Sequence, residues 1–430
     1  MQSSSLTACD GYTLAGVSVS SAHIATWAIA AVAIVGVIAR PRRLPEALWA
    51  VLGALALVAG SLLSFADAVA AVRQGTDVYL FLVGMMLLAE IAREQGVFAW
   101  LAGYAVSHAR GSSSRLFLLV YLVGTAVSIL LSNDATAVVL TPAVYAAARH
   151  ARVPPLPYLY VCAFIANAAS FVLPISNPAN LVVYGRHMPS LQSWLAQFTL
   201  PSVAAILVTF LMLRLALRAQ LTGAPSAPRG TSPLSAGGRI AAGSIGLMAV
   251  ALLTASALGW SLGLPTFLSG GIGAALIWLL VGASPLAALK QLSWSILPLV
   301  GGLFVLVRGV EQTGLLDGLD PWLRTGAAAH GVVFATGAAA AVASNLINNL
   351  PLGLIAGTLA GTNPLPASMS GAALIGVDLG PNLSVTGSLA TILWLLALRR
   401  EGEHVSAWTF LGLGCIVMPP ALLASLLAYL

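Results

Sequence analysis

The sequence predicts an all-α polytopic membrane protein that is built from two inverted repeats. Of its 430 residues, 59% are hydrophobic and only 7% are charged, and the mean hydropathy is +0.95. A soluble domain carries about a quarter charged residues. Apolar runs long enough to cross a bilayer recur along the whole chain. Segments of the first half also resemble segments of the second half in the same order.

About ten segments are expected to be transmembrane helices, because each is a mostly apolar run bounded by charged residues, Gly or Pro. Their ranges are 22–39, 46–64, 78–93, 157–185, 196–213, 240–258, 264–282, 293–310, 371–398 and 407–429. The formal net charge of +6 is spread over the connections without a basic stripe. We therefore expect contact with membrane lipid and no nucleic-acid partner.

The basic residues predict the orientation. By the positive-inside rule, the "RPRR" stretch at residues 40–43 lies in the cytoplasm. Following the spans along the chain then puts 15 of the 19 Lys and Arg residues on that side, the exceptions being Arg73, Arg186, Arg308 and Arg324. Both termini are therefore predicted to lie on the non-cytoplasmic side of a bacterial-type inner (plasma) membrane.

One long polar stretch divides the chain. Residues 219–239, "AQLTGAPSAPRGTSPLSAGGR", are rich in Pro, Gly and Ser, which is typical of a flexible linker. We expect a cytoplasmic tether between a first repeat over residues 1–218 and a second repeat over residues 240–430.

Three pairs of segments indicate the repeat. "FLVGMMLLAEIAREQGVF" (81–98) resembles "PLVGGLFVLVRGVEQTGLL" (298–316). "LLSNDATAVVLTP" corresponds to "NLINNLPLGLIAG", and "SFVLPISNPANLVVYG" corresponds to "DLGPNLSVTGSLATILW". The predicted orientation runs the first segment inward and its partner outward, so the repeats are inverted. Inverted repeats are typical of secondary transporters, which bind substrate near the midplane between the halves.

Two short apolar segments predict a re-entrant hairpin in the first repeat. Residues 116–131 and 135–148 would form helices of about 24 and 21 Å, whereas the hydrocarbon core is about 30 Å thick. The hairpin tip is expected near residues 132–134. Its counterpart in the second repeat has a tip near residues 344–349, followed by an arm in which three glycines permit close packing: Gly353, Gly357 and Gly361.

After each hairpin, a long apolar segment is interrupted near its middle. The breaks are expected near residues 174–180 and 378–388, where helical hydrogen bonding is interrupted by Pro174, Pro178, Gly380, Pro381 and Gly387. Irregular backbone at membrane depth is tolerated only where it is buried in protein or lines a watery cavity. The two tips and the two breaks are therefore the predicted substrate site.

These same motifs carry a family resemblance. "SNDATAVVLTP", "NNLP" and "GVDLGPNLSVTGSLATILWL" resemble the ArsB-type arsenite permeases of the ion transporter superfamily, over nearly the whole chain. The run at 378–391 is its most specific part, and the tips S-N-D and N-N-L depart from the S-N-T tips of dicarboxylate carriers. The resemblance implies export of arsenite and antimonite coupled to inward proton movement, without a cofactor. In some members a separate ATPase subunit assists.

The residue types agree with an uncharged substrate. Arsenite is largely a neutral trihydroxy acid near pH 7, so it needs hydrogen-bond donors and acceptors without a fixed cation. The expected substrate-binding residues are the uncharged polar side chains at the tips and breaks: Asn133, Thr136, Ser176, Asn177, Asn180, Asn348, Asn349, Thr386 and Ser388. Each of them could instead satisfy backbone groups freed at a break. A sodium- or proton-coupled dicarboxylate or citrate carrier, or a sodium/proton antiporter, could use the same groups.

Two carboxylates lie deep in the predicted membrane region, Asp134 in the first repeat and Asp378 in the second. A charged residue at a helix centre costs about 2.5–3.5 kcal/mol on insertion scales. Because removal from water raises the pKa of a carboxyl group, we expect these two residues to carry the coupled protons. The alternative roles are capping a hairpin helix or holding a broken helix in place.

The remaining candidates favour structural roles. We expect Glu90 to pair with Arg93, and Arg308 to pair with Glu311 in a solvated ion pair. A single thiol at Cys162 cannot form a multi-thiolate site, and we expect no metal site. The sequence lacks an HExxH motif, which favours a secondary active transporter over an intramembrane enzyme. A channel would use the same polar groups as a carrier.

Overall fold

The computed structural model describes residues 12–14, 17–39, 41, 44–184, 188–226, 233–315, 330–362 and 366–430. These residues fall into two compact units, one within Met1–Gly75 and Trp294–Gly326 and the other within Thr76–Ser293 and Ala327–Leu430. Each unit combines segments from both predicted halves. Parts of the predicted linker (227–232), span (185) and hairpin arm (327–329) lie outside the described residues, as do Arg40, Arg42, Arg43, Arg186, Arg229 and Arg324.

The smaller unit is helical apart from one short strand pair. Its elements are β1 (Tyr12–Leu14), β2 (Val17–Val19), α1 (Ser21–Ala39), α2 (Glu46–Ala59), α3 (Phe65–Gln74) and α14 (Ile296–Gln312). The strands are antiparallel, with Tyr12 opposite Val19, and three residues are too few to show a periodic pattern in the sequence. Helix α2 packs against α1 and α14, and the indole nitrogen of Trp27 donates to Oγ1 of Thr313 at 2.8 Å.

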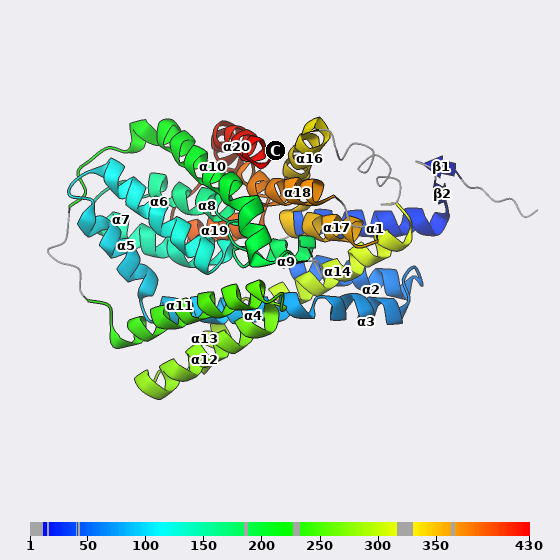
Figure 1. Cartoon of the computed structure of the whole chain (residues 1–430), viewed down its shortest axis with the longest axis horizontal. Helices are drawn as coiled ribbons and strands as arrows, with labels where there is room; N and C mark the ends of the chain where they lie inside the picture. Colours follow the sequence, from blue (N-terminus) through cyan, green and yellow to red (C-terminus); the bar gives the residue numbers. More distant parts are fainter. Residues whose placement is uncertain are drawn as a thin grey trace, which may run out of the picture. The chain divides into compact units, whose positions relative to one another are not determined.

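The larger unit contains the predicted tips and breaks (Figure 1). Its elements are α4 (Thr76–Glu94), α5 (Val97–His108), α6 (Ser113–Leu130), the π-helix η2 (Ala135–Leu140), α7 (Thr141–His150), α8 (Leu156–Ala168), α9 (Pro178–Tyr184), α10 (Leu191–Leu217), η4 (Arg218–Gln220), α11 (Ala236–Ala257), α12 (Gly263–Val281), α13 (Pro285–Gln291), α16 (His330–Ile347), α17 (Asn349–Thr362), α18 (Ala367–Leu379), η6 (Gly380–Asn382), α19 (Leu389–Arg400) and α20 (Ala407–Tyr429). Helix α10 lies beside α20, α16 beside α18, and α4 beside α12. The short helices α3, α5 and α13 were not predicted, since none is long enough to form a span.

Serine side chains determine where many of these helices begin. The hydroxyl oxygen accepts a backbone N–H two or three residues later, which satisfies one unpaired donor of the first helical turn. The capping residues of this kind are Ser64, Ser112, Ser190, Ser235, Ser284, Ser388 and Ser406. Because Ser112 caps α6, this helix begins before Arg115 and reaches 18 residues, longer than the 16-residue arm predicted from the apolar run.

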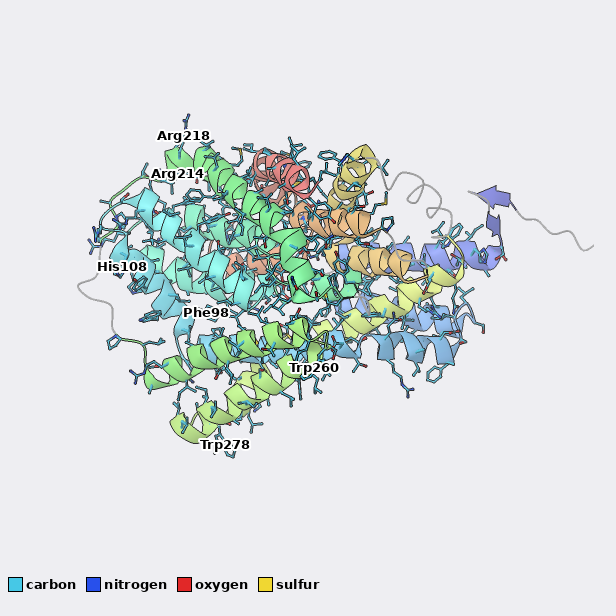
Figure 2. All side chains as sticks on the ribbon, viewed as in Figure 1. Phe98, His108, Arg214, Arg218, Trp260 and Trp278 are labelled. Carbon is cyan, nitrogen blue, oxygen red and sulfur yellow. The ribbon has the colours of Figure 1, made fainter. Side chains whose placement is uncertain are left out.

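Six described helices are long and apolar enough to cross a membrane, or up to eight when α3 with α4 and α13 with α14 are each counted as one interrupted span. Their exposed surface fits lipid. Trp260 and Trp278, at the two ends of α12, are 63% and 56% exposed, and Arg214 and Arg218 lie at the C-terminal end of α10 (Figure 2). Tryptophan is typical of the membrane–water boundary. The chain is therefore a multi-pass membrane protein.

The predicted interruptions are observed. Helix α8 ends at Ala168 and α9 begins at Pro178, while α18 ends at Leu379 and α19 begins at Leu389. We call residues 169–177 the first break and residues 380–388 the second break. The chain also leaves helical geometry after α6 and at Asn348, and we call residues 131–134 the first tip and residues 348–349 the second tip.

Candidate functional site

Asn180 holds the first break in shape. Its amide nitrogen donates to the carbonyl oxygens of Ser170 (2.9 Å), Leu173 (3.2 Å) and Pro174 (3.4 Å). These carbonyls lose helical partners at a proline-containing break. Asn180 is fully buried, and its Oδ1 has no hydrogen-bond partner among the described residues. The Asn180 nitrogen therefore stabilises the backbone of the break, whereas its Oδ1 is left to accept a hydrogen bond from another group.

Asn345 has the corresponding task at the second break. Its amide nitrogen donates to the carbonyl oxygen of Gly380 at 2.9 Å, and its Oδ1 accepts from the hydroxyl of Ser384 at 2.7 Å. The predicted residue Thr386 donates from Oγ1 to the carbonyl oxygen of Asn345 at 3.0 Å. Asn345 lies inside the predicted tip segment 344–349 but was not among the predicted site residues. The sequence does not show which of the neighbouring asparagines lies next to the break.

Each tip is hydrogen-bonded to the break that follows it in the chain. The backbone N–H of Asn133 donates to the carbonyl oxygen of Ser176 at 3.1 Å, and that of Asn349 donates to the carbonyl oxygen of Gly387 at 2.9 Å. At the first tip, the Ser176 hydroxyl also donates to Ile129 O at 3.0 Å. At the second, the Asn348 amide donates to Thr386 O at 3.2 Å. The structure thus brings predicted tip and break residues together.

Thr136 lies within the first hairpin and does not face a break. It is fully buried in η2, and its Oγ1 lies 2.8 Å from Oγ of Ser128. The oxygen Oγ of Ser132 accepts from the backbone N–H of Ala135 at 3.1 Å. The π-helical turn that follows was not predicted; such turns are frequent at functional sites.

The first contact between the two predicted repeats joins Asn177 and Asp378. The Nδ2 of Asn177 donates to Oδ1 of Asp378 at 2.7 Å, and the Oδ1 of Asn177 accepts from the backbone N–H of Ala179 at 3.0 Å. Asp378 is fully buried, and its Oδ2 has no hydrogen-bond partner among the described residues. This hydrogen bond is the contact that one alternative raised from the sequence, holding a broken helix in place, requires.

The second contact joins Ser388 and Asn167. The hydroxyl of Ser388 donates to Oδ1 of Asn167 at 3.3 Å. The Nδ2 of Asn167 donates to Oδ1 of Asn382 at 3.0 Å, and Nδ2 of Asn382 donates to the carbonyl oxygen of Phe164 at 3.0 Å. Thr391 accepts from the same Asn167 nitrogen at 3.4 Å. Asn167, Asn382 and Thr391 were not predicted.

A closer alignment of the repeats would have found Asn167. Helices α8 and α18 both contain 13 residues, and each boundary of α18 lies 211 positions after that of α8. The same offset relates the first residues of α9 and α19. It pairs Asn167 with Asp378, and Asn177 with Ser388.

Asp134 and Asn349 have side chains left for other partners. Asp134 is partly exposed, and although it precedes η2 its carboxylate makes no capping hydrogen bond. The capping alternative raised from the sequence is therefore wrong for Asp134. Asn349 is 5% exposed, and within the described residues no side-chain hydrogen bond is recorded for it. Asn133 uses its Oδ1 to accept from the N–H of Asp134 at 2.9 Å.

The second arm of each hairpin packs against the broken helix of the other predicted repeat. Helix α17 packs on α9, while η2 and α7 pack on α19. At Gly357 a Cβ atom would lie 2.3 Å from the carbonyl oxygen of Val182, so only glycine allows this approach. At Gly353 the nearest atom would be a Val183 methyl at 3.3 Å. Close packing is confirmed at both glycines, whereas the side of Gly361 lies outside the described side chains.

The other sequence candidates have partners within the protein. Arg93 forms two hydrogen bonds to the carboxylate of Glu90, and Arg308 donates to Glu311 at 2.8 Å, so both predicted ion pairs are confirmed. Cys162 is buried and donates to the carbonyl oxygen of Tyr158 at 3.7 Å. Within the described residues, no group of three or more His, Cys, Asp or Glu side chains is arranged to hold a metal ion.

No charged side chain among the described residues acts on either deep carboxylate. The described polar side chains that act on Asp378 are those of Ser170 and Asn177, both uncharged, and burial is what acts on Asp134. The described tips and breaks and the residues beside them therefore carry amides, hydroxyls and two carboxyl groups, and no described Lys or Arg side chain acts on either carboxyl group.

Comparison with known proteins agrees with this architecture. An arsenical pump membrane protein of Escherichia coli is 27% identical over 416 residues, covering 93% of this chain and 97% of the relative. A protein of the same name from Yersinia enterocolitica is 28% identical over 362 residues, covering 80% and 84%. The crystal structure of the Alcanivorax borkumensis YdaH transporter has a TM-score of 0.52 at 17% identity, covering 85% of this chain and 86% of that one, and so shares the fold. The citrate transporter family matches residues 27–379. Since this match spans most of the chain, this multi-pass membrane transporter belongs to the citrate transporter family.

Proposed function

We propose that this transporter exports arsenite and antimonite across the plasma membrane by proton-coupled antiport with alternating access. The similarity to arsenical pump membrane proteins over 93% of the chain supports an arsenical substrate. The remaining support comes from the site chemistry. We further propose an inner-membrane location with both termini outside the cytoplasm, and association with a separate ATPase subunit as an optional state.

The observation that carries the proposal is the charge of the site. Its polar side chains are amides, hydroxyls and two carboxyl groups, and no described cationic side chain acts on either carboxylate. A neutral trihydroxy molecule can donate to carboxylate and amide oxygens and accept from amide nitrogens. A citrate anion would bring its charges toward two carboxyl groups with no protein cation to offset the repulsion.

Paired element lengths support an inverted-repeat carrier with halves over 1–218 and 240–430. Helices α6 and α16 have 18 residues each, and α8 and α18 have 13 each. The hairpin arm α17 packs against α9, and η2 packs against α19. A movement of one half would therefore displace the broken helix of the other half. Such cross-packing suits a site that is opened to each side in turn.

We assign the site residues two kinds of role. Asp134 and Asp378 take up protons that enter as the metalloid leaves. Asn133, Asn349 and Asn180 supply the amide groups nearest to substrate. The others, which use their hydrogen bonds within the protein in this structure, hold the tips and breaks around it: Thr136, Ser176, Asn177, Asn348, Thr386 and Ser388.

The test is arsenite accumulation in everted membrane vesicles, with and without an imposed inside-acid proton gradient, in sodium-free buffer. Gradient-driven uptake above equilibrium is the expected result. Equilibration without accumulation would indicate a channel and overturn the proposal.

The second candidate is a sodium- or proton-coupled carrier of citrate or a dicarboxylate, favoured by the citrate transporter family match over residues 27–379. A bound sodium ion would offset the carboxylates that otherwise repel the substrate. Sodium-dependent citrate or dicarboxylate flux in the same vesicles, without arsenite uptake, would establish this candidate instead.

A further inference from the structure

Two of the hydrogen bonds between the predicted repeats occupy corresponding positions but have different chemistry. In the first, Asn177 donates to Asp378. In the second, Ser388 donates to Asn167. The 211-residue offset between α8 and α18 pairs Asn167 with Asp378. The same offset between α9 and α19 pairs Asn177 with Ser388. Each contact is therefore the counterpart of the other.

The acceptor differs between them. Asp378 is an acidic side chain with one oxygen bound and the other, Oδ2, unpartnered within the described chain. Asn167 is a neutral amide whose oxygen accepts from Ser388 and whose nitrogen donates to Asn382. Asp378 and Asn382 are fully buried and Asn167 is 1% exposed. One contact can therefore gain a proton on a free oxygen, whereas its counterpart has no group that titrates.

The other titratable groups on the elements that pack against α8 and α18 are either exposed or in contact with other residues. Around α8 and α18 these are Arg115 of α6, Arg149 and His150 of α7, Arg214 of α10, His330 of α16, Arg399 and Arg400 of α19 and Cys415 of α20, all exposed, with Asp134 before η2 and Tyr145 of α7 partly exposed. The buried or half-buried ones contact other groups: Tyr121 with Ile206, Tyr158 with Ser113, Cys162 with Tyr158, Tyr160 with the Trp394 ring, Tyr184 with the Trp194 ring, and Tyr429 with Ala367. None of these acts on Asp378, where only Ser170 and Asn177 do.

We propose that Asn167 is a positioning residue that makes the contact with Ser388 insensitive to protons, so that proton binding during transport changes the Asn177–Asp378 contact alone. This inference rests on the proposed proton-coupled function. A proton that binds Oδ2 of Asp378 neutralises the acceptor of the Asn177 amide and weakens that hydrogen bond, since bonds to charged groups are the stronger kind. The first break is then released from α18, while Asn167 keeps the second break attached to α8.

The experiment compares Asn167→Asp, Asn167→Ser, Asp378→Asn and wild type by two measurements. The first is thermal unfolding of the purified full-length protein in detergent across a pH series, which needs no substrate. The second is the pH dependence of gradient-driven arsenite uptake in everted vesicles. Asp378→Asn is expected to remove one pH-dependent step from the unfolding temperature, and Asn167→Asp is expected to add one.

Asn167→Ser separates positioning from titration. It is expected to lower maximal arsenite uptake about tenfold through the loss of about one buried hydrogen bond, with the half-maximal pH of uptake unchanged. A shift of that pH by about one unit, or an Asn167→Asp protein whose unfolding shows no added pH-dependent step, would overturn the inference.

Two further outcomes remain decisive. If Asn167→Asp does not fold, the pH profile of Asn167→Ser decides by itself. If wild type accumulates no arsenite, the proposed function fails, and the unfolding series still tests the inference. An added step in Asn167→Asp then supports a proton-sensitive contact in a carrier of another substrate, and its absence overturns it.

Discussion

The side-chain amide of Asn177 donates a 2.7 Å hydrogen bond to Oδ1 of Asp378, which lies 201 positions later in the chain. It joins the residue before α9 to the last turn of α18. Asn177 is 3% exposed and Asp378 is fully buried, so water competes little for the contact. A buried acid that holds one broken helix next to another is well placed to link proton binding to movement at the site.

We expect this bond to contribute about 1.5–3 kcal/mol to the free energy of unfolding, the range for hydrogen bonds to charged groups. A double-mutant cycle of Asn177→Ala, Asp378→Ala and the double variant measures it, because each single variant removes the bond and the cycle removes contributions that do not depend on the pair. Chemical unfolding in mixed micelles is the readout. A coupling below about 0.5 kcal/mol would show that the bond contributes little.

Asp134→Asn is expected to leave stability within about 0.5 kcal/mol of wild type, because the Asp134 carboxylate caps no helix. Gradient-driven arsenite uptake should nevertheless be lost. The matched control is Ser112→Ala, which removes the cap that accepts from the N–H of Arg115 at the start of α6 and should cost about 1 kcal/mol while uptake persists. Full proton-dependent export by Asp134→Asn would contradict the assignment of Asp134.

Gly357→Ala should destabilise the protein by about 1–3 kcal/mol, since overpacking forces the neighbouring elements apart. The new Cβ would lie 2.3 Å from the carbonyl oxygen of Val182 in α9. Gly271→Ala is the control, because a Cβ on that exposed face of α12 meets no atom within 4 Å. That change should stabilise by up to about 1 kcal/mol through helix propensity. Equal melting temperatures for the two variants would refute the close approach of α17 to α9.

Glu90→Gln tests whether the ion pair at the end of α4 has a part in transport. The Arg93 side chain is 43% exposed, and exposed pairs contribute about 1 kcal/mol or less. We expect a small loss of stability and unchanged arsenite uptake. A large fall in uptake with normal stability would place Glu90 in the coupling machinery instead.

Much of the site was readable from local sequence. The prolines and glycines around residues 174–180 and 378–388 predicted both breaks, because these residues disrupt helical hydrogen bonding wherever they occur. The apolar runs likewise predicted most helices. The same reasoning missed Asn167, which lies within an unbroken apolar helix, and Asn345, which only the position of Gly380 and Ser384 distinguishes from its neighbours. It also shortened α6, because the cap at Ser112 extends the helix past the apolar run.

The sequence by itself determined that the chain crosses a membrane repeatedly, and it determined where its helices are interrupted. These properties depend on composition and on chain-local hydrogen bonding. Only the tertiary structure decided which polar groups meet: Asn177 with Asp378, Ser388 with Asn167, and α17 with α9. The physical reason is that a buried amide or carboxyl group can be satisfied by any suitable partner within hydrogen-bond reach, and residues about 200 positions apart come within that reach only when both halves are folded together.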